Sequence, residues 1–501
     1  MRLFPMNSGQ TRARLVQGGA VFAAVALIAG CGSTYRPVVT PITPSGPPAQ
    51  PSAYAVVVSA PSPTTPGIAT IIDYSGDSVL AEALIGPGPL TFTIDESGSS
   101  GYTVNSDGTL SNFPISSTLQ AKQVSYTTLA STAQPVNLFS PSVGLYAADL
   151  SGDAADVFNG FPQAFKLAIP VAPTPVIIVG PSVLGQRDFA ISQGNSLGGN
   201  VLSGVACNNS PSTATAGEAD GIEVSSLTVS SQIPLGKCPV FAVESPDSRR
   251  FFVLNRGDDT ITVINSQNNT LDSCTPFLNQ SGQMVTCHPS LPLSLSAVTA
   301  TGITPPNGTS GMATTAGPVY AEYNAANSQL VVANYDGNSV SVIDVSLDEY
   351  GNDSSTFGTT FTIPVGNNPA SVTVLADGSR AYTANQTDQT VTIVTLSSHS
   401  VEKTLPVTGH PRTVVSTQNS QYGKVYVASP DSPYLTIVRT DLDIVDTTVL
   451  VEGNVVDVRV SNQNGTNGNS NTVSRRPGFG QPCYLPGASN SATLTVCQTL
   501  P

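Results

Sequence analysis

The sequence contains little charge, few histidines and no tryptophan. Charged residues make up 10% of the 501 residues, and the three histidines are His288, His399 and His410. With so few histidines beside 16 phenylalanines and 15 tyrosines, we do not expect a haem-ligating or metal-hydrolysing centre. The phosphate-binding loop and the H-E-x-x-H zinc motif are also absent from the sequence. The sequence therefore predicts no catalytic constellation.

The first 30 residues are typical of a bacterial export signal. Three arginines precede an apolar stretch, Val16–Ala29, that is too short for a membrane-spanning helix. The stretch leads into Leu27-Ile28-Ala29-Gly30-Cys31, which resembles a bacterial lipobox. We predict cleavage before Cys31 and lipidation of its thiol, with an ordinary secretory signal as the alternative. The resemblance implies an outer-membrane-anchored lipoprotein of the cell envelope, periplasmic or surface-exposed, because Gly32 rather than Asp follows Cys31.

Residues 31–53 are predicted to form a proline-rich tether. Six prolines between Ser33 and Ser52 favour an extended, semi-rigid conformation that would lift a folded body up to about 60 Å from the bilayer. Removal of residues 1–30, which contain three arginines and no acidic residue, changes the formal net charge from −14 to −17. Such a charge argues against a nucleic-acid partner and against a body that lies flat on an anionic membrane. Membrane contact is therefore expected through the lipid at Cys31 alone.

Six cysteines remain after the lipidated one. They are Cys207, Cys238, Cys274, Cys287, Cys483 and Cys497. An even number in an exported chain predicts three disulfides, and fifteen pairings are possible. Proximity in sequence favours the pairs 207–238, 274–287 and 483–497. A metal site is not predicted, because no two cysteines have Cys-x-x-Cys spacing and only His288 lies beside a cysteine.

A repeated unit dominates the middle and the second half of the chain. Pairs of prolines five residues apart follow an Ile or a Leu at Pro170/Pro175, Pro234/Pro239, Pro364/Pro369 and Pro406/Pro411. Sixteen residues after the prolines 239, 318 and 369 stand the asparagines Asn255, Asn334 and Asn385. Between these positions Val, Ile, Thr and Tyr alternate with polar residues, which predicts half-buried strands joined by tight turns such as Asp377-Gly378. We expect each asparagine at the end of the second strand of its unit, where a turn follows and its side chain can bond nearby backbone groups.

A four-stranded unit repeated every 40–50 residues predicts an all-β protein with a β-propeller fold. Eight blades can be counted over residues 54–460, and seven are possible if two weakly patterned units in the first half fuse. The first unit, which begins at Tyr54, supplies only three strands. We expect Val455–Val460 to pair with Tyr54–Ser59, so that a strand from the C-terminal part closes the ring. Residues 461–501 are predicted to be a flexible tail with a disulfide hairpin.

The pattern [IL]-P-[VL]-G-x-x-P, followed by a strand such as VYVAN, resembles the YVTN-family β-propeller repeat. The resemblance is specific over Ile233–Val460 and looser over Tyr54–Ile233. It implies the propeller fold but no single activity, since this scaffold carries binding proteins, lactonase-like enzymes and haem enzymes. Propellers of the WD type and those with a quinone cofactor rely on a recurring tryptophan, which this chain lacks.

Two blades carry long inserts, and several acidic residues invite a metal hypothesis. The segment Ser192–Gly221 is expected between a second and a third strand, and Ser266–Gly317 between a third and a fourth strand. Asp149, Ser151 and Asp153 have the alternate spacing of a calcium loop but lack its glycine and distal glutamate. Asp258-Asp259 lies in a predicted turn. For each of these acidic groups a solvated turn is the favoured interpretation.

The sequence leaves two functions open. The first is a lipid-anchored, non-enzymatic binding or scaffold module for a protein or another macromolecule of the envelope, without a cofactor; the inserts on a rigid scaffold favour it. The second is a lactonase-type hydrolase or isomerase with a divalent ion in the central channel. Glu244 and Glu322 follow their prolines by five and four residues, so their side chains are expected to point in opposite directions. This mismatch weakens the second hypothesis.

Overall fold

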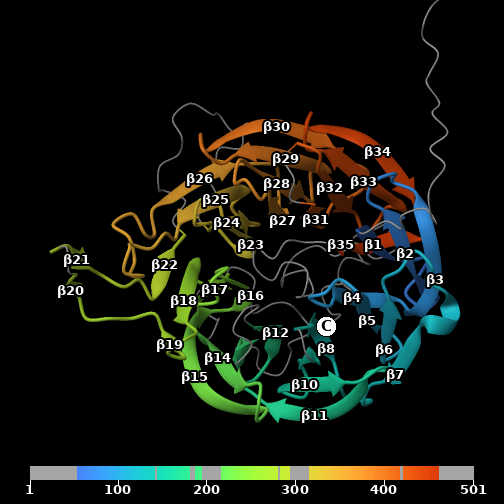
Figure 1. Ribbon diagram of the computed structural model, residues 1–501, viewed down its shortest axis with the longest axis horizontal. Coiled ribbons are helices and arrows are strands. Elements are labelled where there is room, and N and C mark those ends of the chain that lie inside the picture. The colour runs from blue at the N-terminus through green and yellow to red at the C-terminus, as the bar shows by residue number, and fades with distance from the viewer. Residues whose placement is uncertain are drawn as a thin grey trace, which may run out of the picture. The chain divides into compact units, whose positions relative to one another are not determined.

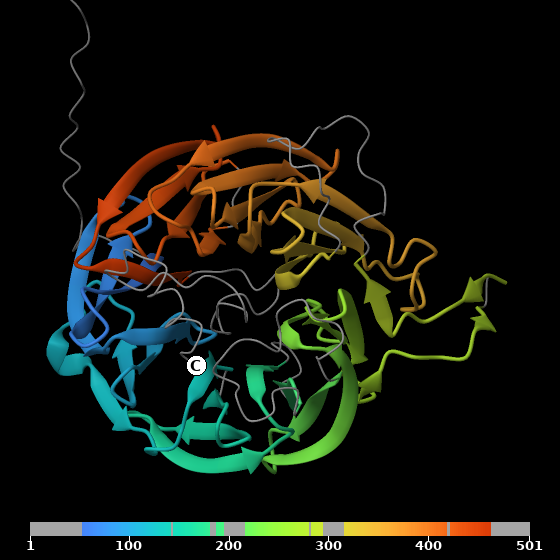
Figure 2. The same cartoon turned by 180° about the vertical axis from the view of Figure 1, so that it is seen from behind.

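The computed structural model describes residues 53–141, 144–180, 187–194, 216–279, 282–293, 315–417 and 421–461. All of them belong to one compact unit, Pro51–Pro501. They form eight antiparallel sheets arranged around a centre (Figures 1 and 2). The innermost strands of neighbouring sheets contact one another all the way round the ring. The predicted β-propeller is confirmed, with eight blades.

In each of the first four blades, the strands follow one another from the centre of the ring to the rim. Blade 1 consists of β35 (Asn454–Val460), β1 (Tyr54–Ala60), β2 (Pro66–Asp73) and β3 (Val79–Pro87). Blade 2 consists of β4 (Pro89–Ile94), β5 (Ser100–Asn105), β6 (Thr109–Pro114) and β7 (Ser125–Thr128), with a short 3-10 helix, η1 (Ala121–Gln123), before β7. Blade 3 consists of β8 (Pro135–Phe139), β9 (Leu145–Asp149), β10 (Ala154–Asn159) and β11 (Ala164–Pro170). Blade 4 consists of β12 (Pro175–Val179), β13 (Arg187–Ser192), β14 (Ala216–Glu223) and β15 (Thr228–Lys237).

The other four blades follow the same order. Blade 5 consists of β16 (Pro239–Glu244), β17 (Arg250–Asn255), β18 (Thr260–Asn265) and an outer position shared by β19 (Thr270–Leu271) and β22 (Ser290–Pro292). Blade 6 consists of β23 (Pro318–Asn324), β24 (Gln329–Asn334), β25 (Ser339–Asp344) and β26 (Thr360–Pro364). Blade 7 consists of β27 (Pro369–Val374), β28 (Arg380–Asn385), β29 (Thr390–Thr395) and β30 (Ser400–Pro406). Blade 8 consists of β31 (Thr413–Ser416), β32 (Lys424–Ala428), β33 (Tyr434–Arg439) and β34 (Ile444–Leu450).

Ring closure follows the predicted pairing. β35 is antiparallel to β1, with Val460 opposite Ala55 and Asn454 opposite Ala60. Because β35 is the innermost strand of blade 1, it also packs against the inner strands β31 and β4 of the two neighbouring blades. A strand from the C-terminal part therefore joins the two ends of the ring by backbone pairing along its whole length.

Burial in the inner strands is continuous rather than alternating. Every residue of β8, β12 and β27 is buried, whereas the outer strand β30 is largely exposed. Each blade is covered on both sides by its neighbours, so both side-chain rows of an inner strand face a core. The expectation of half-buried strands holds only for the rim.

The repeated asparagines lie at the ends of second strands, as predicted. Asn385 closes β28, and its side-chain amide donates to Thr390 Oγ1 at 3.0 Å and to Thr392 Oγ1 at 2.7 Å on β29. Gly366 packs directly on this side chain, because a Cβ atom there would lie 2.7 Å from Asn385 Cγ. The motif glycine and asparagine thus form one contact, which recurs in blades 2 and 5 as Gly86 with Asn105 and Gly236 with Asn255.

The two faces of the ring are distinguished by where the chain enters each blade. We call the face at which Pro239, Pro318 and Pro369 begin their inner strands the entry face, and the other the opposite face. The connection between β13 and β14 leaves from the entry face, as expected for a link between second and third strands. Tyr54 and Ser461, at the two ends of the ring, meet at the opposite face. In the part of the chain that is described, no helix is long and apolar enough to cross a membrane.

Candidate functional site: a pocket beside a disulfide-closed hairpin

The outer edge of blade 5 departs from the repeat. β19 follows β18 after a short turn and pairs with Ile264 and Asn265, and β22 later pairs with residues 260–262 of the same strand. Between β19 and β22 the chain leaves the ring and forms a separate two-stranded hairpin of β20 (Phe277–Leu278) and β21 (Met284–Val285), which projects from the rim (Figure 1). The predicted position of this insert, between the third and fourth strands, is therefore wrong, because it interrupts the fourth strand instead.

A disulfide between Cys274 and Cys287 closes the base of the hairpin, with a Cα–Cα distance of 5.4 Å. This is the pair that proximity in sequence favours, and it is confirmed. The closed loop of the disulfide restricts the conformations open to a segment that no blade covers. The hairpin is thus held at its base although it lies outside the ladder.

A pocket of about 560 Å³ lies between the hairpin and the turn that joins β25 to β26 in blade 6. The lining is mostly neutral and polar, with two carboxylates. It consists of Asn279, Gln283, Met284, Val285, Thr286, His288, Asp348, Asp353, Ser354 and Ser355. The hairpin supplies one wall and blade 6 the other, so the shape of the pocket depends on how the two are fixed to each other.

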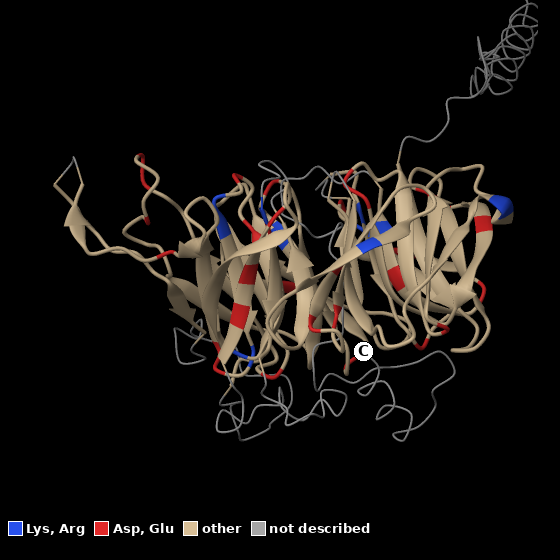
Figure 3. Ribbon diagram, turned by 90° about the horizontal axis from the view of Figure 1, so that it is seen from below, with Lys and Arg blue, Asp and Glu red and all other residues tan. Residues whose placement is uncertain are grey.

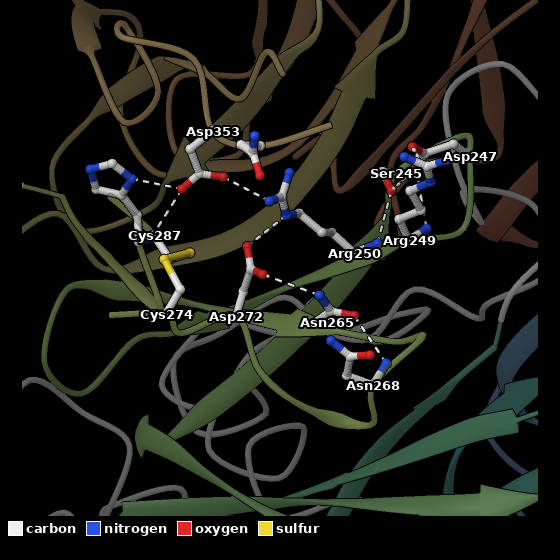
Figure 4. A network of polar contacts seen from close by, with 12 residues as sticks. Ser245, Asp247, Arg249, Arg250, Asn265, Asn268, Asp272, Cys274, Cys287 and Asp353 are labelled. Carbon is white, nitrogen blue, oxygen red and sulfur yellow. Dashed lines mark hydrogen bonds and ion pairs between the residues drawn. A yellow bond between two sulfur atoms is a disulfide. The ribbon is translucent and has the colours of Figure 1, made fainter. Parts of the chain in front are cut away.

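A buried charge network fixes them (Figure 4). Arg250, the first residue of β17, donates from Nε to Asp272 Oδ2 at 2.6 Å and from Nη2 to Asp353 Oδ1 at 2.7 Å. The three side chains are at most 10% exposed. Burial raises the pKa of Asp353, and the hydrogen bond from His288 and the charge of Arg250 oppose that rise. One arginine thereby joins the base of the hairpin segment to a loop of the next blade.

His288 connects the same network to the pocket. Its backbone N–H donates to Asp353 Oδ2 at 3.0 Å, and its ring Nδ1 lies 2.7 Å from the same oxygen. The ring stacks on Phe357, with 5.3 Å between centroids, and the Arg250 guanidinium lies 5.4 Å from the Phe357 centroid. The His288 side chain is 35% exposed. A bond from Nδ1–H to the carboxylate leaves Nε2 as an acceptor.

The other wall is a tight acidic loop. The Asp348 carboxylate accepts the backbone N–H groups of Tyr350 and Asn352, both at 2.9 Å, and the side-chain amide of Asn279 at 3.5 Å. Burial alone would raise the pKa of Asp348, but the hydrogen bonds from Asn352, Tyr350 and Asn279 outweigh it and lower the pKa. Asp348 is therefore held as an anion at the edge of the pocket.

In the described ranges, no serine or cysteine side chain is hydrogen-bonded to His288, and the Ser354 hydroxyl bonds Ser346 Oγ at 2.8 Å. A nucleophile activated by the Asp353–His288 pair would need such a contact. The pair instead joins two wall segments, and the pocket presents amide, hydroxyl and carboxylate groups.

The other predicted cysteines are only partly described. Cys238 is buried, is disulfide-bonded and lies between β15 and β16. Cys31, Cys207, Cys483 and Cys497 lie outside the described residues, as do the signal, the tether and the C-terminal tail. The pairs 207–238 and 483–497 and the lipidation of Cys31 stay predictions.

The remaining histidines belong to other blades. His399, in the turn between β29 and β30, stacks on Phe361 of blade 6 with centroids 3.8 Å apart, and burial lowers its pKa. His410 lies in the connection between blades 7 and 8, with Nδ1 2.5 Å from Asp431 Oδ2 and Nε2 3.2 Å from Gln389 Nε2. The structure therefore does not bring the three histidines together.

The carboxylates of the acidic turns accept hydrogen bonds from backbone N–H groups. Asp149 Oδ1 accepts the Gln134 N–H at 2.7 Å, and Asp153 Oδ1 accepts the Thr174 N–H at 2.8 Å. Asp258 and Asp259 in the same way accept the N–H groups of Lys237 and Gly317. In the described part of the chain, no three His, Cys, Asp or Glu side chains form a group that could hold a metal ion. Each of these carboxylates binds a segment that connects two blades, which gives acidic residues a structural role at this position of several blades.

Glu244 and Glu322 lie at different register positions of their inner strands, as their spacing from the prolines predicts. Both side chains are fully buried. Glu244 lies opposite Phe251, which precedes Asn255 by four residues, whereas Glu322 lies opposite Val331, which precedes Asn334 by three. Glu322 Oε2 accepts the backbone N–H of Val374 in the next inner strand, β27. The structure thus gives Glu322 a role between blades 6 and 7.

Sequence reasoning missed a buried acid in blade 4. Asp188 is 2% exposed, and burial raises its pKa to about 7, against a lowering by the hydrogen bond with Tyr146. Its Oδ2 has no hydrogen-bond partner among the described residues. Asp156 in blade 3 and Asp220 in blade 4 also have pKa values raised to about 6, chiefly by burial. A carboxylate next to a short apolar run, as in RDFAIS, is the signal that could have revealed Asp188.

Comparisons with known proteins support the fold alone. No family model matches the chain, and no curated protein matches it. Apo AztD from Citrobacter koseri superposes with a TM-score of 0.53 at 12% identity, over 81% of this chain and 97% of the other. The dihydro-heme d1 dehydrogenase NirN superposes with a TM-score of 0.51 at 13% identity, over 83% and 77%. A 6-phosphogluconolactonase candidate from Bacteroides fragilis NCTC 9343 reaches 0.47 at 15% identity, over 83% and 99%, too distant to bear on activity. The chain shares a propeller with proteins of diverse kinds.

Proposed function

We propose that this chain is a lipid-anchored β-propeller of the bacterial envelope, built from YVTN-type repeats, that binds a macromolecular partner through the hairpin and the adjoining pocket. Three large apolar side chains of the hairpin are exposed to solvent: Phe277 by 43%, Leu278 by 64% and Met284 by 64%. A disulfide and a buried charge network hold this apolar hairpin in place. That combination, exposed apolar groups on a fixed projection, is the observation that carries the proposal.

The hairpin lies far from the point at which a membrane anchor would be attached. Blade 5 lies across an eight-blade ring from blade 1, where the chain enters at Tyr54 (Figure 1). A tether that precedes Tyr54 would place the hairpin on the side of the ring away from the attachment point. The partner would then be reached without competition from the membrane surface.

The test is crosslinking in envelope extracts with matched variants. Full-length protein with Phe277→Ser, Leu278→Ser and Met284→Ser is compared with the wild type and with a control carrying Leu84→Ser, Phe161→Ser and Phe165→Ser. The control residues are 53%, 67% and 55% exposed and lie on blades 1 and 3. A crosslinked species lost only in the hairpin variant supports the proposal. A species retained in the hairpin variant, or lost equally in both, contradicts it.

The anchor is tested separately by Cys31→Ala. We expect the wild-type protein to remain with the membrane fraction and to carry acyl chains on its N-terminal peptide in mass spectrometry. The variant should lose both properties. Membrane retention of the variant would overturn the lipid anchor and leave the binding proposal intact.

A further inference from the structure

The hairpin is a strand pair with an open edge. Within the described ranges, β21 pairs with β20 alone. Asn279 N–H donates to the Gln283 carbonyl at 2.9 Å, and in the same register Phe277 lies opposite Val285 and Leu278 opposite Met284. Hydrogen-bonded and non-bonded pairs alternate in an antiparallel ladder. The backbone N–H and C=O of Met284 therefore point away from β20.

The strand that carries these groups, β21, lines the pocket. Gln283, Met284, Val285 and Thr286 all line it, and the opposite wall is the loop of blade 6. The space thus lies beside the strand on which the N–H and C=O of Met284 point away from β20. An extended peptide can add to such an edge as a third strand.

Charge distinguishes the two walls. From Ser273 to Leu293 the sequence contains no Asp, Glu, Lys or Arg. The loop of blade 6 carries Asp348 at the pocket and the exposed Glu349 beside it. The body as a whole is acidic, and Figure 3 shows Asp and Glu outnumbering Lys and Arg when the ring is seen edge-on. A strand that enters between these walls meets uncharged side chains, among them Met284, on one side and negative charge on the other.

We infer that the open edge of β21 binds an extended segment of a partner protein by strand addition, with apolar side chains against Met284 and a lysine or arginine directed at Asp348. This inference rests on the proposed function and specifies the chemistry of the partner. Backbone hydrogen bonds supply affinity for any extended chain, and the carboxylates select a basic one.

A second copy of this chain fits the edge less well. Pairing β21 with β21 around a two-fold axis would bring the two acidic loops, each with Asp348 and Glu349, toward one another. Like charges that face each other across an interface oppose association. The edge therefore favours a segment of opposite charge.

The test uses synthetic peptides and the full-length protein. The probe is a blocked eight-residue peptide of alternating valine and lysine, titrated by fluorescence anisotropy at low salt. We expect saturable binding that weakens about tenfold or more when alternate backbone amides of the peptide are N-methylated, since each methyl group removes a donor. A valine–glutamate peptide should not bind. Equal binding of the methylated or the glutamate peptide overturns the inference.

Two proline variants identify the edge. Met284→Pro removes the N–H that points to the pocket, whereas Leu278→Pro removes the equivalent N–H on the far edge of β20, in the same residue pair. Met284→Pro should abolish binding of the lysine peptide and Leu278→Pro should preserve it. Asp348→Asn should weaken binding and reduce its salt dependence. Equal effects of the two prolines, or a concentration-dependent dimer that Met284→Pro dissociates, would refute binding of a partner strand at this edge.

Peptide binding and partner crosslinking can fail separately. If the hairpin variant loses its crosslinked species but the lysine peptide does not bind, the proposed function stands and the strand-addition inference falls. If neither is observed, both fall. The methylated peptides act on the unmodified protein, so this result does not depend on the folding of any variant.

Discussion

Tyr54 and Ser461 bind each other across 407 positions of sequence. The Tyr54 N–H donates to Ser461 Oγ at 2.8 Å, and the Ser461 N–H donates to the Tyr54 carbonyl at 2.9 Å. The pair stands where the other blades have the turn between their first and second strands. The ring is thus fastened by non-covalent bonds at the point where the chain itself is open.

This closure predicts that two truncations will differ sharply. A chain that stops after Ser461 should unfold within a few degrees of the full-length protein, because every described strand is retained. A chain that stops before Asn454 lacks β35, so β1 loses its pairing partner and the inner strands β4 and β31 lose the strand between them. It should be insoluble or unfold cooperatively at a much lower temperature. Thermal unfolding followed by circular dichroism distinguishes the two, and a stable shorter chain would disprove closure by β35.

The glycine–asparagine contact predicts a coupled pair of mutations. Asn385→Ala should lower the free energy of unfolding by about 1–3 kcal/mol, because it deletes two buried hydrogen bonds. Gly366→Ala should also destabilise the protein, since its Cβ would strike Asn385. In the double variant Cγ and Nδ2 of residue 385 are absent but its Cβ remains 2.8 Å from the new Cβ, so the cost of Gly366→Ala should decrease in part. Urea unfolding of the four proteins measures the coupling, and strict additivity would show that the contact is unimportant.

Arg250 should contribute far more to the stability of the protein than the neighbouring Arg249. Arg250→Met leaves Asp272 and Asp353 buried without their cation, which we expect to cost about 3–5 kcal/mol of stability. Arg249→Met is the matched control, because Arg249 is 50% exposed and its contact with Asp247 spans 3.6 Å, and a surface pair contributes about 0–1 kcal/mol. Denaturant titrations should separate the two variants. Similar losses would indicate that the network does not join the hairpin to blade 6.

Asp188 predicts a fall in stability as pH rises. Its pKa is about 7 in the folded protein and close to the ordinary aspartate value of 3.8 in the unfolded chain. Between these values the folded state binds more protons, so the free energy of unfolding declines from about pH 4 to pH 7 and then levels off. Asp188→Asn should reduce this slope, and the remainder would come from Asp156 and Asp220, whose pKa values are about 6. An unchanged pH profile of unfolding in Asp188→Asn would contradict the assignment.

The fold could be predicted because its signals are local. The spacing from Pro369 to Asn385 spans two strands and a turn. Because the same spacing recurs in other blades, the number of blades can be counted from the sequence. The burial of those strands was not predictable from alternation, because both sides are covered by neighbouring blades. Blade 3 is less obvious in sequence since Asp149 occupies the place of the asparagine.

The candidate site could be predicted only in part. The cysteine pair 274 and 287 and the uncharged segment around it indicate an insert outside the ladder. The pocket depends on Arg250 and Asp353, which are 103 residues apart and belong to different blades. No periodic pattern connects them, so only the folded arrangement shows that they meet. The strand β19 has only two residues, too few to be recognised in the sequence, and this is why the insert is expected before the fourth strand.

Because Tyr54 and Ser461 lie in contact, the chain can be made to begin at a different blade without changing the arrangement of the blades in the ring. A circular permutant that joins these two residues by a short glycine-rich link and begins instead at another turn of the opposite face, such as Asp377-Gly378, would retain all eight sheets. Its new ends would leave from blade 7, so the hairpin could be presented at a different angle to whatever surface carries the chain.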